Sequence, residues 1–83
     1  MKRFVWEPSA RADLRRIEQP QALIILQALN RFVRGQGGDV KKLTDDVHDR
    51  YRLRVGDYRV LFALEGRDIL HVFSVENRKD AYR

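Results

Sequence analysis

The sequence of 83 residues contains no cysteine, which excludes disulfide bonds and thiolate metal sites. It has only two histidines, too few for a structural zinc site. No apolar run approaches the roughly eighteen residues of a membrane span, and the first residues carry no signal-like apolar core. We therefore expect a cytoplasmic protein without metal that does not enter a membrane and is stabilised by packing alone.

Acidic residues are in the minority, with 12 Asp and Glu against 17 Lys and Arg and a formal net charge of +5. Most of the basic residues are arginine, whose planar fork can hold a phosphate with two hydrogen bonds. The sequence has no glycine-rich phosphate loop and no nucleophilic serine motif. The charge favours a phosphate-bearing partner, and the alternative is a basic surface that serves solubility alone.

The length allows one modest core, so we expect a single domain over residues 1–83. Residues 3–7 form an aromatic and β-branched run before a proline, which predicts an N-terminal strand. Ser9 is expected to cap a short first helix. The apolar stripe of that helix is Ala10, Leu14 and Ile17.

A second, stronger helix is predicted from Pro20, at its first position, to just before Gly35. Its core stripe is Ala22, Ile25, Leu26, Leu29, Phe32 and Val33. Leu23 and Ile24 lie off that stripe, so they either pack against the first helix or contact a partner protein. Both interpretations stay open at this stage.

Beyond Gly35 the sequence is polar, and residues 35–49 are predicted to form a loop pinned by a few apolar side chains. The period then changes to two over residues 51–55, 58–64 and 69–75, which predicts three strands joined by short turns. The expected fold is α+β: an N-terminal strand, two helices and a three-stranded antiparallel meander. Both helices would pack on one face of the sheet and leave the other open.

A two-residue turn at Gly56-Asp57 sets Arg54 directly opposite Arg59. The open face then carries Arg50, Arg52, Arg54 and Arg59, while the covered face carries Tyr51, Leu53, Val55, Tyr58, Val60 and Phe62. If Gly66-Arg67 is also a two-residue turn, Ser74 lies next to Arg59. Facing like charges destabilise a sheet, and a bound anion would remove that cost. Alternatively, the arginines extend into water or pair with acidic residues, for which the candidates are Asp45, Asp46, Asp49 and Glu76.

Leu43, the two hairpin strands and the C-terminal segment 77–82 together resemble RelE/ParE-type toxins. The most specific pieces are the Gly-Asp-Tyr-Arg turn at residues 56–59 and the closing Arg-x-x-x-Tyr from Arg78 to Tyr82. The order of elements in the first half agrees as well. The resemblance implies the fold predicted above and a toxin of a type II toxin–antitoxin pair, held inactive by a separately encoded cognate antitoxin.

In the RelE branch the resemblance implies cleavage of messenger RNA on the ribosome, by attack of a 2′-hydroxyl on the adjacent phosphate, without metal or cofactor. Carried over to this sequence, Arg59 and Arg78 would hold the phosphate in catalysis and Tyr82 would assist proton transfer. Arg52 and Arg54 would add positive charge, with Arg50 beside them on the same open face. Tyr82 could instead anchor the C-terminal tail by packing.

Two alternatives share this fold. A ParE-like toxin would inhibit DNA gyrase by binding it, and a non-catalytic relative would use its arginines only for an acidic antitoxin or for RNA. In each case Leu23 and Ile24 are candidate antitoxin contacts. Arginine stands in the first hairpin strand where some relatives have lysine, and arginine does not readily give up a proton.

The two histidines have separate expectations. His71 shares a predicted strand face with Ile69, Phe73 and Val75, which favours a hydrogen-bonded core position. His48 lies in the predicted loop, from which it could approach the basic face.

Overall fold

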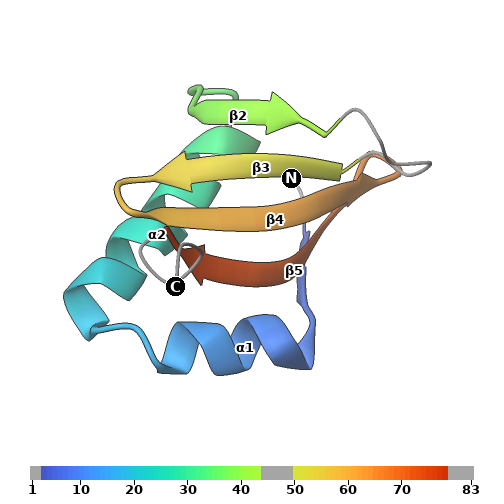
Figure 1. The fold of residues 1–83 in the computed structure, drawn as a ribbon. Coiled ribbons are helices and arrows are strands. Elements are labelled where there is room, and N and C mark those ends of the chain that lie inside the picture. Colours follow the sequence, from blue (N-terminus) through green and yellow to red (C-terminus); the bar gives the residue numbers. More distant parts are fainter. Residues whose placement is uncertain (1–2, 44–49, 79–83) are drawn as a thin grey trace.

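The computed structural model describes residues 3–43 and 50–78. Within them the chain forms two helices and a five-stranded sheet (Figure 1). The elements are β1 Arg3–Trp6, α1 Pro8–Arg15, α2 Gln19–Val33, β2 Asp39–Lys42, β3 Arg50–Val55, β4 Tyr58–Glu65 and β5 Ile69–Asn77. Both helices pack on one face of the sheet, which confirms the predicted α+β class.

The strand order is β1-β5-β4-β3-β2. β2 to β5 form an antiparallel meander, and β1 joins its edge in parallel with β5. The meander has one strand more than predicted, because residues 39–42 pair with β3. The loop prediction was wrong there. Val40 is the single apolar residue of this strand, so the segment shows no apolar alternation from which a strand could be predicted.

The helix starts differ from prediction by one or two residues. α1 begins at Pro8, and its N-cap Glu7 makes no side-chain cap hydrogen bond. The Ser9 hydroxyl instead donates to the carbonyl of Phe73 at 2.9 Å, so the prediction of Ser9 as a cap was wrong. α2 begins at Gln19, which puts Pro20 at the second position rather than the first. At both helices a proline occupies the first turn, where its missing N–H has no intrahelical partner to lose.

The core lies between the helices and the covered face of the sheet. Its largest fully buried side chains are Phe62, Ile25, Leu29, Leu53, Leu70, Val60 and Val72. The ring of Phe62 meets Phe32 edge to face at 5.4 Å and stacks on Tyr51 at 5.6 Å. The predicted apolar face of the hairpin is therefore confirmed as core.

One flank of α2 stays uncovered. Leu23, Ile24 and Leu26 are 55%, 43% and 39% exposed. The placement of Leu26 in the core stripe was wrong, and the exposure of Leu23 and Ile24 favours the second of their two interpretations, contact with a partner protein. Only Ile25 and Leu29 of this helix are fully buried, because the sheet covers a narrow line along it.

The pairing of β4 with β5 is shifted twice relative to the predicted register. The turn holds three residues, 66–68, between Glu65 and Ile69, and a bulge interrupts the ladder between Leu61 and Phe62. Arg59 therefore lies opposite Glu76, and Ser74 lies opposite Leu61. The prediction of Ser74 beside Arg59 was wrong. Phe73 is the bulged residue, without a partner of its own in the ladder.

Candidate functional site

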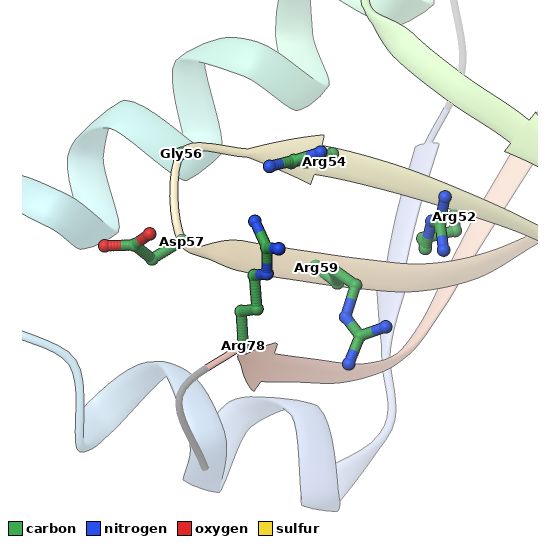
Figure 2. A pocket seen from close by; sticks show the side chains of 6 residues that line it. All are labelled: Arg52, Arg54, Gly56, Asp57, Arg59 and Arg78. Atoms are coloured by element: carbon green, nitrogen blue, oxygen red, sulfur yellow. The ribbon is translucent and has the colours of Figure 1, made fainter. Parts of the chain in front are cut away.

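A pocket of about 160 Å³ lies at the turn end of the β3–β4 hairpin. It is lined by Arg52, Arg54, Gly56, Asp57, Arg59 and Arg78 (Figure 2). Gly56 has a φ of 58°, the left-handed conformation that this tight turn requires. Figure 2 shows the carboxylate of Asp57 pointing away from the guanidinium groups. The pocket is therefore cationic in character.

Each arginine reaches the pocket for a local reason. Arg52 and Arg54 alternate with buried Leu53 on β3, so their side chains lie on the open face, and Arg54 pairs with Arg59 as predicted. Arg78 follows β5, and its backbone N–H donates to the carbonyl of Asp57 at 2.6 Å. This bond ties the end of β5 to the hairpin turn. The side chain of Arg78 then extends across β4 toward Arg54 (Figure 2).

Two of these arginines each bury one side-chain nitrogen that has no hydrogen-bond partner. The Nε atoms of Arg52 and Arg59 are covered from solvent, and in the described part of the chain they meet no acceptor. A buried donor without an acceptor costs about 1–3 kcal/mol. Pairing of Arg59 with Glu76, one alternative from the sequence, is not observed although the two residues are cross-strand neighbours. An anion in the pocket would supply the missing acceptors.

Arg54 and Arg59 form the middle of a row of cross-strand neighbours, and an acidic residue lies at each end of this row. Asp39 pairs with Arg54 across β2 and β3, and Glu76 pairs with Arg59 across β4 and β5. The row thus reads acid, arginine, arginine, acid across four strands. The positive charge is concentrated at the hairpin, and an acidic residue flanks it on each side. This arrangement favours a compact anion such as a phosphate over a broad acidic surface.

The other predicted site residues lie elsewhere. The guanidinium carbon of Arg50 lies over the ring of Phe73 at 4.7 Å from its centroid, on the open face but outside the pocket. Leu23 and Ile24 are exposed on α2. Tyr82 and His48 fall outside the described residues.

His71 is not a core residue, so that prediction was wrong. Its side chain is 18% exposed, with Nε2 at 2.6 Å from Glu7 and Nδ1 at 2.7 Å from Glu65. The ring also stacks on Phe73 at 4.7 Å. The bulge explains the error, because it places Val75 in the core while His71 stays on the open face. No local pattern in the sequence indicates that bulge.

Two further findings bear on the kind of site. Within residues 3–43 and 50–78, no group of three or more His, Cys, Asp and Glu side chains is arranged to hold a metal ion. In the same residues, neither helix has the length and hydropathy needed to cross a bilayer.

Comparison with known protein families matches residues 4–82 to the ParE toxin of the type II toxin–antitoxin system parDE. The chain belongs to the RelE/ParE toxin superfamily. The resemblance, which is most specific in the hairpin and the C-terminal segment, is thereby confirmed, and the match includes both helices. A search of curated proteins finds no match to this toxin.

Solved structures show the same fold. The RelB–RelE antitoxin–toxin complex of Methanococcus jannaschii matches with a TM-score of 0.76 at 22% identity, over 94% of each chain. The RelBE2 complex of Mycobacterium tuberculosis matches with a TM-score of 0.71 at 17% identity, over 93% of this toxin and 98% of that chain. A single-residue variant of YafQ from E. coli matches with a TM-score of 0.72 at 5% identity, over the whole of both chains.

Proposed function

We propose that this toxin is a metal-independent endoribonuclease that cleaves messenger RNA on the cytoplasmic ribosome. The observation that carries the proposal is the pocket at the hairpin turn, where four arginines converge and two of them keep buried donors unpaired. A phosphate diester of the RNA backbone supplies acceptors for these donors and a charge that offsets the arginines. A surface that served solubility alone would not bury its guanidinium nitrogens.

The proposed reaction is an internal transfer. The 2′-oxygen forms a bond to the adjacent phosphorus, the bond from phosphorus to the 5′-oxygen breaks, and the products carry a cyclic phosphate and a 5′-hydroxyl. Arg59 and Arg78 hold the non-bridging oxygens and stabilise the charge that develops in the transition state. Arg52 and Arg54 strengthen the positive field on the hairpin side.

Proton transfer completes the proposed reaction. A base takes the proton of the 2′-hydroxyl, and the departing 5′-oxygen receives one. Tyr82, four residues beyond Arg78, is the candidate base that the family resemblance implies, and arginines close to a phenol favour its phenolate form.

The proposed protein partner is a cognate antitoxin, as RelB is for RelE in the complex from Methanococcus jannaschii. Leu23 and Ile24 are the candidate contacts, because apolar side chains more than 40% exposed on one helix gain by being covered. Truncating both to alanine would then weaken antitoxin binding, and unchanged affinity would remove this assignment.

A second candidate function is inhibition of DNA gyrase without cleavage. The match to the ParE family model favours it, because the description of that family is the ParE toxin. In that case the arginine pocket would bind DNA phosphate or a carboxylate of the enzyme. The fold is common to both functions, so the pocket's chemistry has to be tested directly.

The test adds purified toxin to ribosomes programmed with a defined message and maps cut ends by primer extension, with free RNA in parallel and EDTA added only in endpoint controls. We expect cuts in the ribosome-bound message and a loss of at least about 100-fold on Arg59→Ala with Arg78→Ala. The matched control is Arg31→Ala with Arg34→Ala, which removes the same charge from α2, away from the pocket. Intact messages combined with blocked gyrase supercoiling would replace the endonuclease by the gyrase inhibitor.

A further inference from the structure

We propose that the open face of the sheet carries a second subsite, which stacks a nucleobase of the same RNA strand whose phosphate lies in the arginine pocket. The inference rests on the proposed RNA substrate. The subsite consists of Arg50, Phe73 and His71, called here the aromatic subsite. The Arg50 guanidinium lies 4.7 Å from the Phe73 centroid, and the His71 ring stacks on Phe73 at 4.7 Å with 28° between their planes.

Phe73 belongs to this face because it alternates along β5 with Val72, which is buried. Val72 and Val75 on either side of it are buried in the core at 0% and 5% exposure. The bulge follows at once, since Ser74 pairs with Leu61 and Phe73 has no ladder partner of its own. Bulges often lie next to functional sites. The ring of Phe73 thus lies beside Arg50 and His71 at an interruption of the ladder.

Charge distinguishes the aromatic subsite from the arginine pocket. His71 lies between the carboxylates of Glu7 and Glu65, at 2.6 Å and 2.7 Å from its ring nitrogens. Two carboxylates at this position disfavour a phosphate, whereas a base gains from flat rings and a guanidinium plane. The two carboxylates can also accept from an exocyclic amino group of the base.

The spacing suits one continuous strand of RNA. Arg54 lines the pocket and Arg50 belongs to the aromatic subsite, so four residues of β3 separate them, about 14 Å at ~3.4 Å per residue. Arg52 lies between them on the same face and lines the pocket. A backbone that leaves the pocket along β3 can thus place the base of a neighbouring nucleotide over Arg50 and Phe73.

The experiment compares two probes of equal length bound to the full toxin by fluorescence anisotropy. One is a 2′-O-methyl RNA, which binds but cannot be cut, and the other is its abasic analogue, which keeps the phosphates. We expect wild-type toxin to prefer the base-bearing probe about tenfold, and Phe73→Leu to remove that preference. Arg59→Ala should weaken both probes equally, because it acts on phosphate. The matched control is Phe4→Leu, an exposed aromatic on β1 paired with buried Leu70, which should keep the preference.

A second variant, Arg50→Gln, covers the case that Phe73→Leu does not fold. Loss of the base preference in either folded variant, with abasic binding unchanged, supports the aromatic subsite. An unchanged preference in both, while ribosome-bound message is still cut, overturns the subsite and leaves the proposed endonuclease intact. Binding of neither probe, with no cleavage, overturns the endonuclease and the subsite together.

Discussion

The two faces of the sheet differ in how completely their side chains find packing or hydrogen-bond partners. On the covered face, Leu53, Val60 and Phe62 are at most 1% exposed and pack against the helices. On the open face, the same two strands set Arg54 opposite Arg59 and bury the Nε of Arg59 without an acceptor. Along each strand, residues that are neighbours in sequence thus alternate between a well-packed apolar face and a face where a buried hydrogen-bond donor has no acceptor.

This difference separates stability from function. Burial of the apolar face stabilises the hairpin. This stabilisation offsets the repulsion between like charges that face each other across the ladder, which costs up to about 1 kcal/mol. A small domain can keep such a row only where the opposite face holds the register firmly. In the proposed function the open face binds the ligand, and the covered face holds that binding surface in place.

The largest expected effect is on the covered face. Phe62→Ala should lower the free energy of unfolding by about 3–5 kcal/mol, because it removes a ring packed against Phe32 and Tyr51. Urea unfolding followed by circular dichroism measures the loss. Arg54→Ala, on an exposed side chain of the adjacent strand, is the control and should not lower the free energy of unfolding by more than about 0.5 kcal/mol. Equal losses in the two variants would contradict the separation of the faces.

A smaller effect is expected from Arg59→Lys. The charge stays, but the planar fork that can hold two phosphate oxygens is lost, so cleavage of ribosome-bound message should fall about tenfold. The salt dependence of binding to RNA should keep its slope, whereas Arg59→Ala should reduce that slope by about one. Full activity in the lysine variant would mean that charge alone, and not the geometry of the pocket, is used.

The smallest expected effect is a gain in stability. Arg54→Gln removes the like-charge contact with Arg59, so the unfolding free energy should rise by a few tenths to about 1 kcal/mol at low salt. The gain should shrink in high salt, where exposed charges are screened. A loss of stability instead would show that Asp39, the other cross-strand neighbour of Arg54, already compensates the repulsion.

Much of the fold could be predicted because it is encoded locally. The alternation over residues 51–62 and the Gly56-Asp57 turn determine the register of β3 with β4, and with it the arginines of the pocket. The amphipathic period of α2 placed Ile25 and Leu29 in the core correctly. The prediction that Arg78 belongs to the same site came from the family resemblance. In the structure, the hydrogen bond from the Arg78 backbone N–H to the carbonyl of Asp57 holds it there.

The sequence by itself determined the fold class, the covered and open faces of the hairpin and the facing pair Arg54 and Arg59, because a period of two and a tight turn are properties of neighbouring residues. Only the tertiary structure decided the pairing of β2, the bulge at Phe73 and the carboxylates around His71. Each of these depends on which segment lies alongside, and such pairing satisfies backbone groups without leaving a periodic pattern in the sequence.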